Sequence, residues 1–400
     1  MSLDYQQVRE QIKSLGESAT GRAARLQNLR VQAGELLRSN AGEIERLRQK
    51  VNTIVRNHDP NLRCALPAWG PDGEAEPLDG HYSLPPLPEQ ATILAADGSQ
   101  ISPDRHAAVN FCLINVGTIQ MRLNDALPPE ITTRSQLLYD EDLYTETGGM
   151  LSEAQVALMR DLNERERLKD LASKAAGPVI TFTDGPMELW GAGEGESSEF
   201  KKSLEKYMGV LENLSQQGVI TAGYVDKPAA NLMVRLLEIA MLPGDQLAQV
   251  KRYYPLRGVI DRDLFQGLLA PGERSAVFAI QSRSVQNYRG ELALHFFYLN
   301  VGRTGHPWLA RVEIPAWVAS ERKMLDHLHA VLVHQCTILG SRPFPYLLHR
   351  AHEAAVVTLE EKEQVTQMIL LELRNRGIEV GEMSQKQAVK NLQGRTTYER

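Results

Sequence analysis

Apolar residues recur at mostly helical intervals through the first 55 residues, among many Arg, Glu and Gln. The series runs through Val8, Ile12, Leu15, Leu26, Leu29, Leu36, Ile44, Leu47, Val51 and Ile54. Such spacing places a stripe of apolar side chains along a helix. The pattern predicts one or two long amphipathic helices within residues 1–57. This stripe must be buried, either against its own domain or as an arm against a second protein.

The next stretch, residues 58–89, is crowded with Pro, Gly and Asp and has no sustained period. This composition is typical of a linker or an irregular surface loop, because Gly and Pro interrupt both helices and strands. A domain boundary near residue 90 is therefore expected.

Beyond residue 90, apolar runs of strand length alternate with helical patterns. The run 91–96 ends in Asp97-Gly98, and residues 107–123 supply further strand-like runs, as in a hairpin or meander. Residues 153–174 have a helical pattern, and the apolar run after them again ends in Asp-Gly, at Asp184. Both aspartates are thus expected at strand ends.

The remaining segments continue this alternation as far as residue 376. Helical patterns cover residues 198–217, 231–241 and most of 320–376, and strand-like runs cover 219–225, 275–281, 291–300 and 308–314. The order predicts an α/β fold, with a mixed β-sheet flanked by helices and a long helical segment at the N-terminus. The predicted domain spans residues 90–380, and residues 381–400 are expected to form a polar C-terminal tail.

The composition is that of a globular protein, with 42% hydrophobic and 24% charged residues. No apolar stretch approaches the roughly 20 residues of a membrane helix, and no signal peptide is recognisable, so a soluble cytoplasmic protein is expected. Cys64, Cys112 and Cys336 are scattered and support neither disulfides nor a zinc site. The net charge of −6 argues against coating of nucleic acid by bulk electrostatics, but allows a local basic groove.

Asp97 and Asp184 are the main candidates for chemistry. Each follows an apolar run, and acidic side chains at strand ends gather at the rim of a sheet, where ligands bind. Hard cations such as Mg²⁺ and Mn²⁺ prefer carboxylate oxygens and support phosphodiester cleavage. Glu164 or Glu166, from the helix before the second strand, could supply a third ligand. The alternatives are a solvated charged face for the glutamates and simple Asp-Gly turns for the aspartates.

At this point the chain resembles the NurA nuclease family. The resemblance rests on ordered blocks over roughly residues 90 to 360 rather than on one motif. They read AADGSQ, FTDGP, GYVDKP, VIDRDLFQGLLAPGERSAVF, FFYLN, ARVEIPAWV and PFPYLLHRAHEAA.

The resemblance implies an RNase H-like core and a Mn²⁺- or Mg²⁺-dependent deoxyribonuclease. It further implies 5′–3′ exonuclease activity, a second endonuclease activity on single strands, and a ring-shaped homodimer docked on a HerA-like hexameric ATPase. The process would be DNA end resection in double-strand break repair, or DNA defence. Matched residue by residue, Asp97 and Asp184 correspond to the family's metal ligands, and Glu164 or Glu166 corresponds to the family's glutamate. Both are candidate catalytic residues, Glu166 is assigned to the metal-ligand set, and His352 is the family's histidine.

The match departs from the family at Phe344, where the family often has a tyrosine before proline. Tyr346 could replace the missing hydroxyl only with a different loop geometry. His349 is a second candidate for the histidine, although Ala351-His352 fits the motif better.

Three further residues are candidates for substrate binding. Lys227 and Arg262 each follow an aspartate at the end of a strand-like run and so present a cation near the sheet rim. For Arg262, the alternative interpretation is a local ion pair with Asp261. Ser99, from the DGS sequence, completes the group.

Two other functions are compatible with the residues. Loss of the hydroxyl at Phe344 is consistent with a catalytically weakened docking module for the ATPase. The same carboxylates could also serve a metal-dependent phosphohydrolase of small phosphoesters, because fold does not determine substrate.

Overall fold

The computed structural model describes residues 3–70, 73–105, 107–189, 197–340 and 342–378. The predicted tail at residues 381–400 lies outside this range. The chain divides into two compact units. Unit 1 comprises residues 1–87, 185–187 and 222–344, and unit 2 comprises residues 88–184, 188–221 and 345–400. The second half of the predicted 90–380 domain is thus shared between two units.

Unit 1 contains the N-terminal helices and the later strands. Its helices are α1 (Tyr5–Ser39), α2 (Ile44–Asn57), α5 (Leu232–Met241), α6 (Asp261–Phe265), α7 (Ala316–Ala319) and α8 (Arg322–Ile338). The 3-10 turns are η3 (Gly244–Arg252), η4 (Arg283–Gln286) and η5 (Gly290–Leu292). Its strands are β1 (Cys64–Pro67), β2 (His81–Tyr82), β8 (Arg274–Ser275), β9 (Phe278–Gln281), β10 (Leu294–Asn300) and β11 (Leu309–Pro315), together with most of β7 (Ile220–Asp226).

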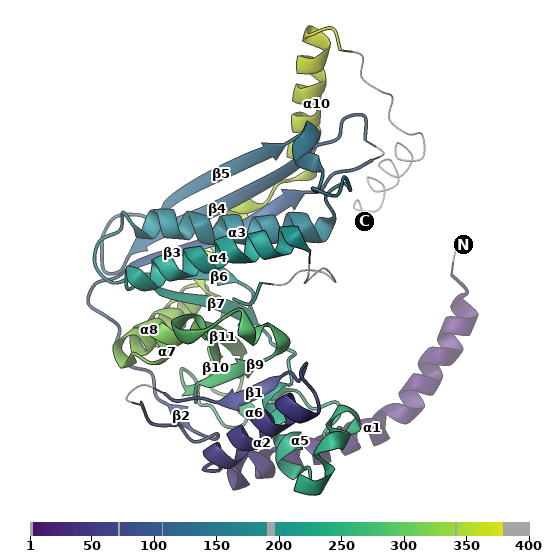
Figure 1. Cartoon of the computed structure of the whole chain (residues 1–400), viewed down its shortest axis with the longest axis vertical. Coiled ribbons are helices and arrows are strands. Elements are labelled where there is room, and N and C mark those ends of the chain that lie inside the picture. Colours follow the sequence, from purple (N-terminus) through teal and green to yellow (C-terminus); the bar gives the residue numbers. More distant parts are fainter. Residues whose placement is uncertain (1–2, 71–72, 106, 190–196, 341, 379–400) are drawn as a thin grey trace. The chain divides into compact units, whose positions relative to one another are not determined.

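The strands of unit 1 follow the order β1-β9-β10-β11-β7, and each neighbouring pair is antiparallel. The strand β1 lies in the stretch that the sequence led us to expect as a linker or loop. It is buried because Cys64–Pro67 pairs with β9 along its whole length. The long helical segment expected at the N-terminus is confirmed as α1 and α2 (Figure 1).

Unit 2 contains both predicted aspartates. Its strands are β3 (Thr92–Ile101), β4 (Cys112–Arg122), β5 (Glu130–Leu138) and β6 (Val179–Asp184). Its helices are α3 (Glu153–Ala172), α4 (Ser198–Gln216), α9 (Tyr346–Ala355) and α10 (Leu359–Asn375), and η2 (Asp140–Leu143) follows β5. The order is β6-β3-β4-β5, with an antiparallel β3-β4-β5 meander and β6 parallel to β3. The predicted α/β class, with a mixed sheet flanked by helices, is confirmed.

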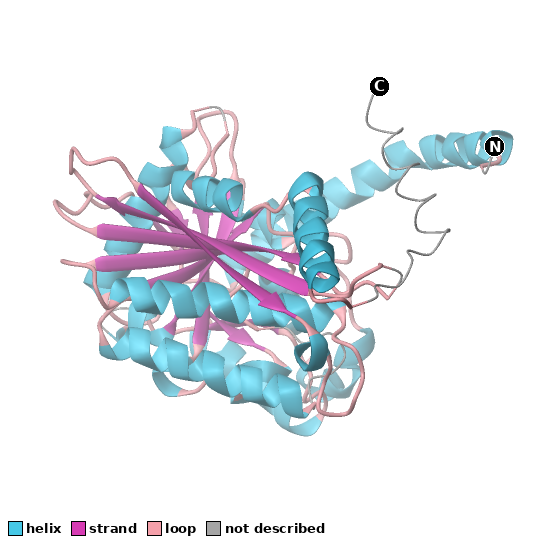
Figure 2. Ribbon diagram, turned by 90° about the horizontal axis from the view of Figure 1, so that it is seen from above, coloured by secondary structure: helices cyan, strands magenta, loops and turns pink. Residues whose placement is uncertain are grey.

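The helices α3 and α9 cover opposite faces of the unit 2 sheet, and α4 lies beside α3 (Figure 1). Figure 2 shows strands in magenta with helices in cyan packed along them. The register explains why α3 and α9 lie on opposite faces. Asp97 pairs with Gly117 and Gly98 pairs with Val116, and neighbouring residues of a strand point to opposite faces. A Cβ on Gly98 would meet side chains of α3, whereas one on Gly117 would meet the backbone of α9 at 2.6 Å. Both helices therefore approach the sheet at positions where a glycine leaves room.

Among the helices in the described ranges, none is both long enough and apolar enough to cross a membrane.

Candidate metal centre

Asp97 and Asp184 lie on neighbouring parallel strands of unit 2. The register pairs Ala96 of β3 with Thr183 of β6, and each aspartate is the next residue along its strand. Asp184 ends β6 as predicted, but Asp97 lies inside β3, which continues to Ile101 alongside β4. The pairing of β3 with β6 ends before Asp97, whereas the pairing of β3 with β4 continues past it. Both carboxylates therefore lie at the same end of the β3–β6 pair.

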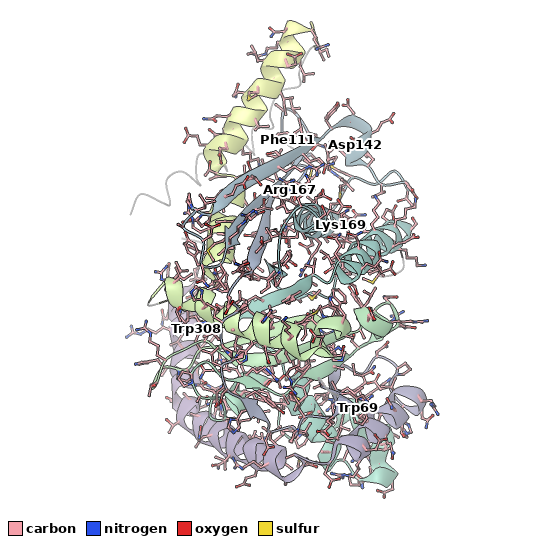
Figure 3. All side chains as sticks on the ribbon, turned by 90° about the vertical axis from the view of Figure 1, so that its left-hand side faces the viewer. Trp69, Phe111, Asp142, Arg167, Lys169 and Trp308 are labelled. Atoms are coloured by element: carbon pink, nitrogen blue, oxygen red, sulfur yellow. The ribbon has the colours of Figure 1, made fainter. Side chains whose placement is uncertain are left out.

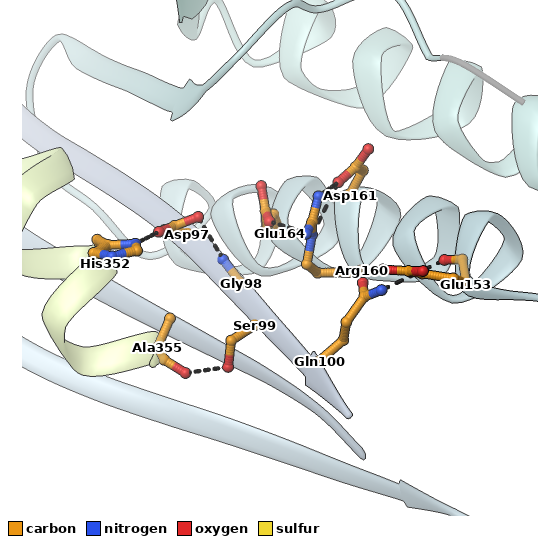
Figure 4. Close-up of polar contacts among 10 residues, drawn as sticks. All are labelled: Asp97, Gly98, Ser99, Gln100, Glu153, Arg160, Asp161, Glu164, His352 and Ala355. Atoms are coloured by element: carbon orange, nitrogen blue, oxygen red, sulfur yellow. Dashed lines mark hydrogen bonds and ion pairs between the residues drawn. The ribbon is translucent and has the colours of Figure 1, made fainter. Parts of the chain in front are cut away.

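His352 of α9 lies directly against Asp97. Its Nδ1 donates to Asp97 Oδ2 at 2.6 Å, and the backbone N–H of Gly98 donates to Asp97 Oδ1 at 2.8 Å (Figure 4). The imidazole is 64% exposed and the Asp97 side chain 17% exposed. The site is therefore open to large ligands on the α9 side.

The hydroxyl of Ser99, two residues beyond Asp97, donates to the carbonyl of Ala355. The amide of Asn115 donates to the same carbonyl at 2.8 Å. These bonds tie the C-terminal end of α9 to the sheet. The structure thus uses the Ser99 hydroxyl to hold the helix that carries His352, rather than presenting it to solvent as a substrate contact.

Glu164 reaches the opposite face of β3, where Gly98 makes room for it. An ideal Cβ on Gly98 would be 2.7 Å from Glu164 Oε1 and 2.5 Å from Arg160 Cγ. Glu164 is only 6% exposed. Burial first, and then the negative charges of Asp161 and Asp97, raise its pKa well above the usual value. A cation between these acids would relieve their repulsion.

Glu166 points elsewhere on α3. Two residues along a helix rotate the side chain by about 200°, so Glu164 and Glu166 cannot face the same strand. Glu166 lines a cavity of about 410 Å³ whose other walls include Tyr144, Met159, Phe200 and Lys206. This placement favours Glu164 as the carboxylate that accompanies Asp97.

Arg160 and Asp161 also belong to this cluster, and the sequence analysis did not single them out. The guanidinium of Arg160 donates to Asp161 Oδ1 at 2.7 Å and lies 3.5 Å from Glu164 Oε1 (Figure 4). The one available signal was Gly98, since a glycine beside a candidate ligand indicates close approach of another segment.

Within the described ranges, the other predicted residues make no hydrogen bond or ion pair with this cluster. His349 faces Glu353 at 3.5 Å on its own helix. Lys227 and Arg262 belong to unit 1, and the contacts of Asp261 in the described range are to backbone N–H groups and Tyr298, not to Arg262. Phe344, also in unit 1, packs edge-on against Tyr224 with ring centroids 5.6 Å apart.

The carboxylates of this cluster are of the chemical type that suits a hard cation, but their positions do not form a complete metal site. No group of three or more His, Cys, Asp or Glu side chains within the described ranges has the geometry to hold a metal ion. Glu164 Oε1 nevertheless reaches Gly98, the residue after Asp97, and the two carboxyl groups lie close enough for the Asp97 charge to raise the pKa of Glu164. Carboxylates in this arrangement, joined by Asp184 on the neighbouring strand, fit Mg²⁺ or Mn²⁺ by chemistry.

The family comparison decides the identity of the domain. The model of the NurA domain matches residues 91–357, which is more than half of the chain. The chain belongs to the NurA family. The matched range includes every carboxylate of the cluster and His352, and membership supports a nuclease as the coarse function.

Comparison with solved structures finds distant likenesses. The NurA nuclease from Sulfolobus solfataricus is 12% identical with a TM-score of 0.45, over 74% of this chain and 88% of that one. The catalytic domain of human Endonuclease V is 14% identical with a TM-score of 0.30, over 71% and 85%. Drosophila Piwi is 10% identical with a TM-score of 0.29, over 66% and 29%. No curated protein sequence matches. These values are too low to carry an argument on substrate.

Proposed function

We propose that this NurA-family protein is a deoxyribonuclease that hydrolyses DNA phosphodiesters with Mn²⁺ or Mg²⁺. The observation that carries the proposal is the juxtaposition of two acids at neighbouring positions of β3: Glu164 Oε1 reaches Gly98, the residue after Asp97, and the negative charge of Asp97 acts on the buried Glu164. Asp184 follows the strand residue paired beside Asp97. Clustered carboxylates that repel one another contribute little to the stability of a fold, but they suit a divalent cation.

In this proposal Asp97, Glu164 and Asp184 hold the cation. When bound, the cation polarises the scissile phosphate and lowers the pKa of water. Glu166 drops out of the proposed ligand set because its side chain lines a different surface of α3.

In this proposal His352 orients the Asp97 carboxylate and transfers a proton to or from the groups that react at the scissile phosphodiester. Because Nδ1 donates to Asp97, the neutral imidazole keeps the lone pair of Nε2 available. A base that is held by a carboxylate and exposed to solvent can take a proton from water or return one to the leaving oxygen.

The substrate in this proposal is a polymer rather than a small phosphoester. His352 and Asp184 are both exposed, so the cluster lies at an open edge and not in an enclosed pocket. An open edge admits a DNA strand that extends beyond the reacting phosphate, whereas small ligands are usually bound in concave sites that bury most of their surface. From family membership, rather than from this geometry, we infer 5′–3′ exonuclease activity, with endonuclease action on single strands as a second activity.

We further infer a cytoplasmic homodimer that works with a HerA-like hexameric ATPase in DNA end resection or in defence. Family membership is one support. The other is α1, whose first turns expose the apolar side chains of Tyr5, Ile12 and Leu15. An apolar row of this kind on a surface helix is typical of a protein contact.

The test is cleavage of end-labelled linear DNA, single- and double-stranded, with Mn²⁺, Mg²⁺ or EDTA. Metal-dependent cleavage by the wild type that Asp97→Ala and Asp184→Ala both abolish is the expected result. Thermal unfolding of each variant checks that the fold survives. Absence of cleavage even with the cognate ATPase present would refute the nuclease and leave a docking module. Cleavage that persists in EDTA would refute the metal-dependent mechanism.

A further inference from the structure

Lys227, directly after β7, has a strained backbone. Its φ is +42°, a region that L-residues with side chains seldom adopt. In the described part of the chain, the other non-glycine residues with positive φ are Asn124 and Asp140. Asn and Asp tolerate this conformation because their short side chains bond locally, but Lys has no such compensation. Strain of this kind persists only where surrounding contacts impose it, and it marks candidate functional positions.

The contact that accompanies this strain is the indole of Trp308, labelled in Figure 3. The Lys227 Nζ lies 3.9 Å from the centroid of the ring. The indole is oriented in turn by Asp226, since Trp308 Nε1 donates to Asp226 Oδ1 at 2.7 Å. The three residues belong to unit 1 and form a chain of contacts from carboxylate to indole to ammonium.

This arrangement leaves the donors of Lys227 available. Asp226 is adjacent in sequence and would be the natural ion-pair partner, but its carboxylate is turned to the indole. Within the described ranges, no carboxylate lies at ion-pair distance from the exposed Lys227 ammonium. A contact with the face of an aromatic ring attracts the charge without accepting a directed N–H bond. The ammonium is therefore held in place while its three N–H groups stay free for a ligand.

We propose that Trp308 and Asp226 are positioning residues that hold Lys227 for a phosphate of the DNA backbone. The inference rests on the proposed function only for its substrate class. An oxyanion is the ligand that an exposed ammonium with free donors recognises. A protein with a net charge of −6 gains little from bulk attraction to DNA, so each phosphate contact depends on a locally placed cation. Fixing a lysine beforehand also reduces the side-chain entropy lost on binding.

The experiment measures binding of fluorescein-labelled single-stranded and duplex oligonucleotides in EDTA, where no metal-dependent cleavage occurs. Affinity is followed by anisotropy from about 50 to about 200 mM salt, because each phosphate contact contributes about 0.7–0.9 to the salt slope. Lys227→Gln is expected to weaken binding by about threefold to tenfold and to lower the slope by one contact. Lys227→Arg is expected to keep the slope. Lys323→Gln, an exposed lysine of α8, is the matched control for the change in charge.

Two further variants separate positioning from folding. Trp308→Leu keeps the lysine charge but removes its aromatic support, so we expect the affinity for DNA to fall. Adding Lys227→Arg to Trp308→Leu is not expected to restore that affinity. Lys227→Gly relieves the positive φ, so its melting temperature should rise while its binding matches that of Lys227→Gln. A lysine needed only for the fold would lower the melting temperature when replaced by glycine.

The inference is overturned if Lys227→Gln and Lys323→Gln have the same affinity and salt slope, or if the wild type binds no DNA. Wild-type affinity in Trp308→Leu would overturn the positioning role. The outcomes that compare variants are independent of the nuclease proposal. A protein that binds DNA through Lys227 but cleaves nothing refutes the nuclease alone, and one that cleaves DNA while Lys227→Gln binds normally refutes this inference alone.

Discussion

The two units treat their buried acids in different ways. In unit 1, Asp261 accepts hydrogen bonds from the backbone N–H groups of Met233 and Val234, at 3.0 and 2.9 Å, and from the hydroxyl of Tyr298 at 2.6 Å. Glu76, also in unit 1, meets the buried guanidinium of Arg274 through two hydrogen bonds and accepts a third from a backbone N–H. These acids connect elements of the fold, and each oxygen has a donor.

In unit 2, the acids face one another. Glu164 is buried, yet its surroundings include the charges of Asp161 and Asp97, and Arg160 is shared between Glu164 and Asp161. A fold gains nothing from such repulsion, because burial of a charge is compensated only by well-placed partners. The difference separates acids that stabilise a domain from the acids that we propose as ligands of a cation.

The largest effect is expected for a substitution of Glu164, the buried acid on which this comparison depends most. Glu164→Gln keeps the size of the side chain but removes the ionisable oxygen, so loss of one ligand should cost several kcal/mol of transition-state stabilisation. We expect a fall in DNA cleavage on the order of 10³-fold. The melting temperature should stay the same or rise, because the amide carries no charge to bury. Rates on end-labelled DNA with saturating Mn²⁺ measure the first effect, and calorimetry measures the second.

Glu166→Gln is the matched control for that experiment. It makes the same chemical change two residues along α3, where the side chain lines the cavity beside α4. We expect cleavage within about twofold of the wild type, in line with a surface substitution. Equal losses in both variants would show that α3 is rotated relative to β3, and a loss confined to Glu166→Gln would return that residue to the ligand set.

An intermediate effect is expected on stability at Asp261. Burial is the largest cause that raises its pKa, to about 6 from 3.8, while bonds from Tyr298 and the backbone lower it. Because the folded pKa is raised, the native state binds the proton more tightly, and this contribution is fully present below pH 4 and is lost as pH rises through about 6. The shift corresponds to roughly 3 kcal/mol. The free energy of unfolding of the wild type should therefore fall by about that amount, relative to Asp261→Asn, between pH 4 and pH 7.

Urea unfolding at several pH values, followed by tryptophan fluorescence, measures that difference. The signature is the pH dependence of the gap between the two proteins, rather than the stability of either one. A constant gap would mean that Asp261 has the same pKa in the folded and unfolded states, and that its three donors fully compensate its burial. Asp261 would then be a stronger example of a structural acid than its raised pKa indicates.

Local patterns were enough to predict the strands and helices that carry the site. The apolar runs before Asp97 and Asp184 are strands, and the helical pattern over residues 153–174 is α3. The strand β5 was not predicted, because Glu130–Leu138 is an exposed edge strand whose polar side chains show no apolar alternation. The strand β1 lies among prolines and glycines, and its burial comes from pairing with β9, more than 200 residues away in the chain.

The choice between the two glutamates could not be made from the sequence. Leu158, Leu162 and Leu168 define the apolar side of α3, but Glu164 and Glu166 flank that side almost equally in the sequence. Which of them meets β3 depends on the rotation of the helix against the strand, and therefore on tertiary packing. Lys227 was chosen for its charge and its place after a strand. Its support by Trp308 joins segments 81 residues apart, which no local pattern reveals.

The smallest expected effect sharpens the comparison at Gly98, the point where β3 admits Glu164. Gly98→Ala would bring a methyl group to 2.7 Å from Glu164 Oε1 and 2.5 Å from Arg160 Cγ, both on side chains that can shift. We therefore expect the fold to survive and Mn²⁺ affinity, measured by calorimetric titration, to fall by about tenfold, as for a displaced support of a metal ligand. Gly209→Ala on α4 is the control, since a Cβ there meets nothing within 4 Å and should leave Mn²⁺ affinity unchanged. If Gly98→Ala binds Mn²⁺ as the wild type does, Glu164 is not a ligand. The acids of unit 2 would then differ from those of unit 1 in their hydrogen bonding, but not in having a metal-binding function.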